Sequence, residues 1–281
     1  MIRPAEEKDR PALEELYNLC FPGEPDFCRW FFDCVYRPGN TLVLTEKNIL
    51  VSALQMLPII LSDGKRQANC GYLYAVGTRP EYRGGGRMAR LLEESFAVMR
   101  GRGDSLAVLI TQEPSLIRFY ARFGFQPVFS RQMRRTDGNP LPQGYTARPA
   151  VERDIPVLDE IYSRGSAGIW HPLRSGEGWK RILRQYGKGA RVLLAPGGRI
   201  SAYALLEEGI GAPNATEAAG ADVSALMAGE AARLGTGPAQ WYGPSFSSDG
   251  EQNGCALALT DEGEEILACF GGRGYLNVLF N

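Results

Sequence analysis

The stretch RPEYRGGGRMARLLEE, residues Arg79–Glu94, places three consecutive glycines between two arginines, directly ahead of a segment with helical periodicity. Apolar residues recur in that segment at the spacing of one helix face, and the pattern stops at Gly101. The strand predicted before the turn, CGYLYAVGT, and the continuously apolar SLAVLIT after it complete a strand–turn–helix–strand unit. Such a right-handed crossover puts the glycine turn at the carboxyl ends of neighbouring strands.

The glycine turn has the properties of an anion-binding site. A helix start leaves backbone N–H groups unpaired and carries positive partial charge, so it binds phosphate when no side chain blocks the approach. Gly84, Gly85 and Gly86 leave that approach open, and Arg83 and Arg87 add full charges suited to a pyrophosphate or a ribose phosphate. Taken alone, the same residues are also compatible with a loose surface turn.

The elements predicted around this unit give a mixed α/β fold. Residues 1–135 predict the order strand, two helices, three strands, helix, strand, helix, strand. The second helix, within Pro22–Tyr36, has Asp26 as its expected N-cap, and the last helix begins near Pro114 and ends at Gly124. The expected ranges of the other elements are 2–4, 9–20, two strands within 41–61, 70–78, 88–101, 105–111 and 125–134.

The chain contains an internal repeat. RPAEEKDRPALEELY (Arg3–Tyr17) and RPAVERDIPVLDEIY (Arg148–Tyr162) are identical at nine of fifteen positions, and each predicts a short strand leading into a helix. Convergent capping chemistry is the alternative to a duplication. The polar segment TDGNPLPQG (Thr136–Gly144) is typical of a linker, so we predict domains at 1–135 and 145–281 joined by 136–144.

Composition narrows the classes of function. The hydrophobic content of 44% is ample for packed cores, and the apolar run Ile49–Leu61 is too short and too interrupted for a membrane span. The acidic N-terminus is unlike a secretory signal, so we expect a cytoplasmic protein. The first 135 residues have 19 basic against 15 acidic side chains and the remainder 12 against 17, a pattern unlike a nucleic-acid-binding face.

Metal and histidine chemistry are not indicated. Six scattered cysteines form no CxxC pair, and we expect all six to be buried. The one histidine, His171, has no nucleophile motif to serve.

The glycine turn resembles the acetyl-CoA loop of the GNAT acetyltransferases, whose pattern is Arg/Gln-x-x-Gly-x-Gly/Ala. The matching residues are Arg83-Gly84-Gly85-Gly86-Arg87-Met88, and Met88 departs from the last position. The Eis-like branch of the superfamily also tolerates a large residue there. A second match is SLIRFYARFGFQP (Ser115–Pro127), which resembles the closing motif of that branch, Tyr-x-Arg-Phe-Gly-Phe, with Tyr120 at the tyrosine.

The resemblance implies an acetyl-CoA-dependent N-acetyltransferase in which Tyr120 is the general acid for the departing thiolate. It implies that the backbone of Val76, Gly77 and Thr78 lines the pantetheine arm and that Ser115 contacts the cofactor. The further cofactor-binding residues are the turn itself and the first helical turn: Arg83, Gly84, Gly85, Gly86, Arg87, Met88 and Ala89. On spacing alone, Tyr120 also reads as a core residue in an aromatic cluster.

The acceptor side is less defined. The family builds its acceptor pocket where Glu24, Asp26 and Trp30 fall, although Trp30 also reads as helix core, and Glu113 is a weak candidate for a base. We expect the partners to be acetyl-CoA and an amine of a small molecule or peptide, without nucleic acid or membrane. The alternatives are a non-catalytic acyl-CoA-binding module and a transferase for another acyl group.

The second half reads as a degenerate copy. It offers a hairpin within Gly189–Gly209 and a helix at Val223–Gly235, but Ala218-Ala219-Gly220 precedes that helix without an arginine. We expect this half to hold no coenzyme A pyrophosphate and to wall the acceptor site. Eis-like enzymes carry a further C-terminal domain, so their base and aminoglycoside-type specificity are not transferred to this chain.

Overall fold

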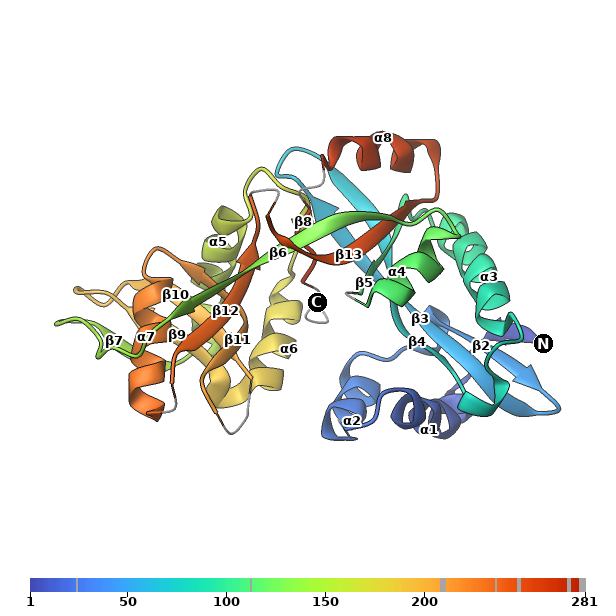
Figure 1. Cartoon of the computed structure of the whole chain (residues 1–281), viewed down its shortest axis with the longest axis horizontal. Helices are drawn as coiled ribbons and strands as arrows, with labels where there is room; N and C mark the ends of the chain where they lie inside the picture. Colours follow the sequence, from blue (N-terminus) through green and yellow to red (C-terminus); the bar gives the residue numbers. More distant parts are fainter. Residues whose placement is uncertain are drawn as a thin grey trace. The chain divides into compact units, whose positions relative to one another are not determined.

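The architecture was analysed in a computed structural model that describes residues 1–23, 25–111, 113–207, 211–235, 237–246, 249–271 and 274–277. Figure 1 shows the elements in chain order. The helices are α1 (Arg10–Cys20), α2 (Pro25–Cys34), α3 (Arg87–Gly101), α4 (Pro114–Ala121), α5 (Ile155–Gly165), α6 (Gly176–Tyr186), α7 (Val223–Leu234) and α8 (Asp261–Cys269).

The strands follow the predicted order in the first half. They are β1 (Ile2–Pro4), β2 (Thr41–Glu46), β3 (Ile49–Ser62), β4 (Gln67–Thr78), β5 (Leu106–Ile110), β6 (Gln126–Thr136), β7 (Thr146–Pro149), β8 (His171–Pro172), β9 (Ala190–Leu194), β10 (Ile200–Leu206), β11 (Asn214–Gly220), β12 (Ala239–Pro244) and β13 (Glu251–Ala258). Asp26 lies within the first turn of α2, whose first residue is Pro25, and is therefore not the predicted N-cap.

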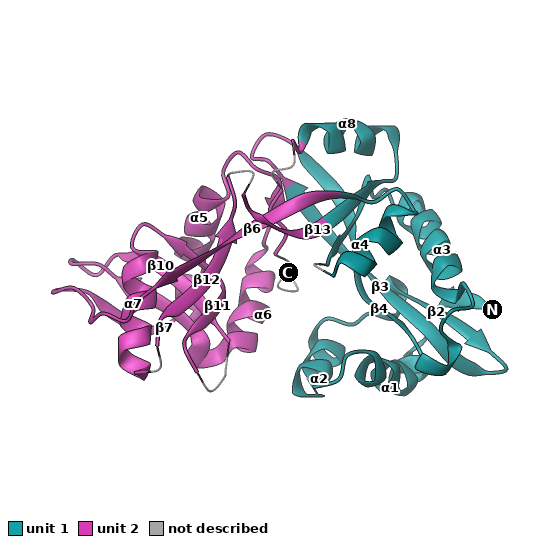
Figure 2. Cartoon of the chain, viewed as in Figure 1, with its two compact units in different colours: residues 1–61, 67–126, 255–269 teal, residues 62–66, 127–254, 270–281 magenta. Residues whose placement is uncertain are grey.

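The chain forms two compact units, and each is built from separate stretches of sequence (Figure 2). Unit 1 consists of residues 1–61, 67–126 and 255–269, and unit 2 of residues 62–66, 127–254 and 270–281. The division therefore differs from the predicted boundary at 136–144. Its physical cause is long-range strand pairing, because β6 pairs with β12 in unit 2 while the end of β13 completes the sheet of unit 1.

The sheet of unit 1 has the order β1-β2-β3-β4-β5-β13. β1, β2 and β3 are antiparallel neighbours, whereas β4 and β5 are parallel and pair only at Cys70–Tyr72 with Leu106–Val108. Helices α1 and α2 lie on one side of β2–β4 and α3 on the other (Figure 1). A core cluster between α3 and the sheet includes Leu91 and Leu92, which are fully buried as the helical spacing predicted.

The sheet of unit 2 repeats this order with the strands β7-β9-β10-β11-β12-β6. β11 and β12 are its parallel pair, joined through α7, just as β4 and β5 are joined through α3. The sequence repeat has a matching geometry: Arg3 contacts Asp9 at 2.6 Å, and Arg148 contacts Asp154 at 2.6 Å. Both carboxylates also accept a hydrogen bond from a backbone N–H three residues earlier, so each clamps a strand to the helix that follows it.

Cysteine burial agrees with the sequence in part. Cys28, Cys70 and Cys255 are buried and Cys20 and Cys34 are half-buried, but Cys269 is exposed. The prediction for Cys269 was wrong because this residue ends α8, where the helix surface meets solvent.

Candidate active site

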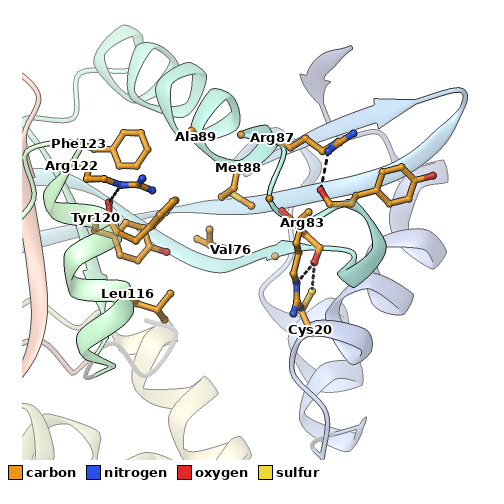
Figure 3. Close-up of a pocket in the computed structure, with 16 residues that line it drawn as sticks. Cys20, Val76, Arg83, Arg87, Met88, Ala89, Leu116, Tyr120, Arg122 and Phe123 are labelled. Atoms are coloured by element: carbon orange, nitrogen blue, oxygen red, sulfur yellow. Dashed lines mark hydrogen bonds between the residues drawn. The ribbon is translucent and has the colours of Figure 1, made fainter.

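A pocket of about 760 Å³ lies in unit 1, where β4 continues beyond its short pairing with β5. Figure 3 shows its walls, which come from β4, the glycine turn, α3 and α4. The lining residues are Cys20, Val76, Gly77, Thr78, Tyr82, Arg83, Gly84, Gly86, Arg87, Met88, Ala89, Leu116, Phe119, Tyr120, Arg122 and Phe123. Ten of the twelve residues predicted from sequence thus surround one cavity, and their roles stay predictions.

The floor of the pocket is the end of β4. Ala75 has φ of +48°, a left-handed conformation that interrupts the regular strand just before Val76, Gly77 and Thr78. A Cβ on Gly77 would lie 3.0 Å from Sγ of Cys20, so the glycine permits α1 to pack closely here. The carbonyl of Thr78 at this end of the strand accepts hydrogen bonds from Nε of Arg83 and from Sγ of Cys20.

The glycine turn leaves the start of α3 open. Gly84 and Gly86 have φ of +83° and +70°, which glycine adopts without the strain that a side chain would add. A Cβ built on either residue meets no atom within 4 Å, so space remains in front of the turn. The first intrahelical bond runs from the N–H of Arg90 to the carbonyl of Gly86, so the preceding amides of α3 have no partner within the helix.

Gly85 does not line the pocket and has a different reason to be glycine. A Cβ at this position would lie 2.3 Å from Nη1 of Arg87, because the guanidinium folds back across the turn. Gly85 therefore makes room for an arginine, whereas its two neighbours supply backbone conformation.

The two arginines of the turn differ in their electrostatics. Arg83 is exposed, and its Nε donates to the carbonyl of Thr78 at 3.1 Å. Arg87 forms a bidentate ion pair with Glu46, with Nε–Oε1 at 2.8 Å and Nη2–Oε2 at 3.0 Å. The sequence analysis expected both arginines to add full charges beside the turn, but the charge of Arg87 is balanced by Glu46, from the β2–β3 hairpin.

Met88 and Ala89 lie half-buried at the first turn of α3 and line the pocket. Met88 also packs against the core cluster of unit 1. Met88, the residue that departs from the family pattern, therefore contacts both the core and the cavity.

Tyr120 lies on α4, across the pocket from Arg83 and Arg87 (Figure 3). Its side chain is 6% exposed and makes edge contacts with Phe119 and Phe125, at ring-centroid distances of 5.2 and 5.6 Å. Burial, with a smaller effect of Cys255, raises the pKa of the phenol to about 12. The phenol therefore stays protonated and able to donate a hydrogen bond at any physiological pH.

Other predicted residues lie outside the cavity. Ser115 is exposed and its hydroxyl donates to Glu113 at the start of α4, so the expected contact of Ser115 with the cofactor is not seen in the pocket lining. Asp26 is exposed beside Arg29, and Trp30 is half-buried against Phe27. Glu24 lies outside the described residues.

Sequence reasoning missed six lining residues: Cys20, Tyr82, Leu116, Phe119, Arg122 and Phe123. Leu116, Phe119 and Phe123 had a signal, since they follow one another at spacings of three and four residues around Tyr120. Cys20 had none, because its position depends on how α1 packs against Gly77.

Unit 2 contains the one histidine. His171 is buried, its Nδ1 contacts the carbonyl of Ile169 at 2.8 Å, and burial lowers its pKa. Over the described ranges, no group of three or more His, Cys, Asp and Glu side chains is arranged to hold a metal ion. In the same part of the chain, no helix is long and apolar enough to cross a membrane.

Residues 1–128 match the family described as "Acetyltransferase (GNAT) domain". Since this range contains every residue that lines the pocket, the part of the chain that carries the candidate site belongs to the GNAT acetyltransferases. No curated protein matches the chain by sequence.

Solved structures extend the similarity of fold to both halves. A conserved protein of Enterococcus faecalis V583, described as a probable N-acyltransferase, has a TM-score of 0.71 at 13% identity over 92% of this chain and 72% of that one. Eis1 from Mycobacterium abscessus has a TM-score of 0.64 at 14% identity, with 92% and 74% covered. Saccharomyces cerevisiae N-myristoyltransferase with bound myristoyl-CoA has a TM-score of 0.60 at 12% identity, with 92% and 78% covered. The mixed α/β GNAT fold predicted from the sequence is confirmed.

Proposed function

We propose that the chain is an acetyl-CoA-dependent N-acetyltransferase that moves an acetyl group directly to a primary amine of a small molecule or peptide. One observation carries the proposal: a single cavity has open helix-start amides at one end and the buried phenol of Tyr120 at the other. This spacing of an anion site and a proton donor suits a cosubstrate whose diphosphate and sulfur lie at opposite ends of a flexible arm.

The glycine turn would hold the diphosphate. The unpaired amides at the start of α3 supply donors with positive partial charge, and Arg83 adds an exposed cation beside them. The irregular end of β4, from Val76 to Thr78, would pair its backbone with the amide groups of the pantetheine arm. The residues present therefore fit coenzyme A.

Tyr120 would donate the proton that the sulfur takes. The amine nitrogen forms its bond to the carbonyl carbon, the carbon–sulfur bond breaks, and the departing thiolate receives a proton from the phenol. A phenol with a pKa of about 12 donates to an ordinary thiolate only weakly. The same desolvation that raises the pKa of Tyr120 would raise that of a thiol beside it, which brings the two values closer.

The acyl group is proposed to be short. On the α1 side of β4, Ala75 and Gly77 border a cavity of only about 10 Å³. Tyr17, Phe21 and Phe32 close that cavity, and the ring centroids of Tyr17 and Phe21 are 5.1 Å apart. Such a space is about the size of one water molecule, so a long acyl chain would find no room on this side of β4.

The amine is proposed to lose its proton to solvent. The residues that line the pocket include no carboxylate and no histidine within the described parts of the chain. The rate should therefore rise with pH as the free amine increases, up to the ordinary pKa of about 10 for an alkyl ammonium.

A second candidate function is a non-catalytic acyl-CoA-binding module. The tight aromatic packing of Tyr120 favours it, because a core tyrosine would be buried in the same way.

Two measurements test the proposal. Calorimetry with acetyl-CoA should give saturable binding at one site, and mass spectrometry of amine panels incubated with acetyl-CoA should detect an acetylated product. Binding without any product would favour the non-catalytic module, and an absence of binding would remove both candidates.

A further inference from the structure

Each nitrogen of the Arg87 guanidinium donates a hydrogen bond within the protein. Its Nε and Nη2 donate to the two carboxylate oxygens of Glu46, and its Nη1 donates to the carbonyl of Tyr82 at 2.9 Å. It also lies over the ring of Tyr82, 5.4 Å from the centroid. Yet Arg87 lines the pocket, at the end formed by the open glycine turn. An arginine that faces an anion site is therefore paired with an anion from its own chain.

Glu46 has the properties of a displaceable ligand. It is the last residue of β2, it does not line the pocket, and its side chain is 36% exposed, so it can turn to solvent without opening a cavity. The hydrogen bond from Arg87 lowers the pKa of Glu46, which keeps the carboxylate ionised. Its bidentate geometry toward the guanidinium is the geometry that a phosphate also adopts.

We propose that Glu46 stands in for a phosphate, and that the 3′-phosphate monoester of coenzyme A displaces it from Arg87. This inference rests on the proposed function of the pocket. A monoester dianion carries more charge than a carboxylate and offers three terminal oxygens, so it can compete for the guanidinium. The diphosphate oxygens carry less charge each and are used by the helix-start amides.

Glu46 thereby becomes a specificity-determining residue. A ligand that lacks the monoester has nothing to offer Arg87 in exchange for the lost ion pair, so it leaves Glu46 in place. The carboxylate thus lowers the affinity for coenzyme A itself, and it sets how strongly the pocket distinguishes coenzyme A from dephospho-coenzyme A.

The competing explanation is structural, because the ion pair also ties the start of α3 to the β2–β3 hairpin. The two explanations differ in sign. A tether predicts that loss of the Glu46 charge loosens the turn and weakens every ligand alike. Displacement of the carboxylate predicts that the same change tightens the binding of coenzyme A and leaves the binding of dephospho-coenzyme A nearly unaffected.

The chain offers a matched control. Glu15 forms a similar bidentate pair with Arg79, at 2.9 and 2.8 Å, at the start of the same turn, and neither residue lines the pocket. Glu15→Gln removes the same charge and weakens an equivalent ion pair, so it reports the purely structural effect.

The experiment is calorimetry of coenzyme A and dephospho-coenzyme A with the wild type, Glu46→Gln, Arg87→Gln and Glu15→Gln. Glu46→Gln should lower the dissociation constant of coenzyme A by about 3- to 10-fold, where tenfold corresponds to about 1.4 kcal/mol. It should change the dissociation constant of dephospho-coenzyme A by less than about 2-fold. Arg87→Gln should weaken coenzyme A by about 10-fold and bring the two dissociation constants together. Glu15→Gln should leave their ratio unchanged.

Unchanged or weaker coenzyme A binding by Glu46→Gln overturns the inference while the proposed function stands. Equal gains for both ligands also overturn it, because the monoester would then play no part. If the wild type binds neither ligand, the proposed function fails first and the inference falls with it.

Discussion

The two units share one strand order, but in the described parts of the chain the predicted site residues surround a pocket in unit 1 alone. In unit 1 the parallel strands β4 and β5 are joined through residues 79–86 and α3, whereas in unit 2 residues 221–222 alone lead from β11 into α7. Unit 1 also has α4 and Tyr120 after its second parallel strand, while residues 245–250 alone separate β12 from β13. The two units share the strands and the crossover helix, and they differ in the connections, where the candidate site of unit 1 lies.

The connection between the first parallel strand and the crossover helix also differs in its contacts with the first helix of each unit. In unit 1, Arg79 at the start of the long turn contacts Glu15 and donates to the carbonyl of Leu50. In unit 2 the counterpart of Glu15 in the sequence repeat is Glu160, which borders a pocket of about 870 Å³ together with Ala221. Glu160 pairs instead with Arg164 on its own helix, and Arg164 also lines this pocket.

The largest expected effect concerns Tyr120. Tyr120→Phe should lower the turnover number by about 100-fold or more, because general acid catalysis contributes factors of that size, while the dissociation constant of acetyl-CoA stays within about 2-fold. Steady-state kinetics and calorimetry measure the two quantities. The control is Tyr186→Phe in unit 2, which removes a buried hydroxyl next to Thr216 and should leave turnover unchanged. Unchanged turnover in Tyr120→Phe would exclude it as the acid.

Stability offers the second comparison, through Gly263 in α8. A Cβ at this position would lie 2.1 Å from the carbonyl oxygen of Ser105, so Gly263→Ala should destabilise unit 1 by about 1–3 kcal/mol, although the residue lies far along the sequence. Gly101→Ala is the control, since its Cβ would meet no atom within 4 Å. Denaturation followed with and without acetyl-CoA measures the change, and equal stability of the two variants would contradict the assignment of α8 to unit 1.

The glycine turn can be compared with a turn of unit 2 that has the same backbone requirement. Gly86 and Gly197 have φ of +70° and +94°, and both have open surroundings. Alanine at either position should cost about 1 kcal/mol of stability. Only Gly86→Ala should weaken the binding of acetyl-CoA, because only this substitution shifts the amides at the start of α3. The expected loss of affinity is about 5-fold, or about 1 kcal/mol. A similar loss of affinity in both variants would mean that the turn has no special part.

The smallest expected difference is between the repeated clamps. Arg3 and Arg148 lower the pKa of Asp9 and Asp154, so each carboxylate contributes stability above its unfolded pKa of about 4 and loses it as the pH falls through the lower folded value. Asp9→Asn and Asp154→Asn should each cost about 1–3 kcal/mol at pH 7, and almost nothing near pH 2.

The more buried Asp154 should give the larger loss of the two, by a few tenths of a kcal/mol (~0.3). Denaturant titrations at both pH values measure the difference. A loss at pH 7 that persists near pH 2 would show that charge is not the cause.

Local chemistry made much of unit 1 predictable. The helix faces, the strand order and the glycine turn depend on residues close in sequence. Arg83, Gly84 and Tyr120, which these local patterns selected, line one pocket, and their roles stay predictions. Contacts between segments far apart in the sequence could not be predicted from such local patterns. The pairing of Arg87 with Glu46 and the assignment of β13 to two units depend on tertiary packing, which periodicity does not encode.

The sixth strand of unit 1 has a consequence for biosynthesis. Because β13 is the last strand of its sheet and residues 255–269 belong to unit 1, the ribosome must reach these residues before the pocket-bearing unit is complete. An N-terminal segment that ends before residue 255 lacks the strand that pairs with β5 in the complete sheet. Until then the free edge of β5 is exposed to other chains, and we expect chaperones that cover such edges to raise the yield of active protein.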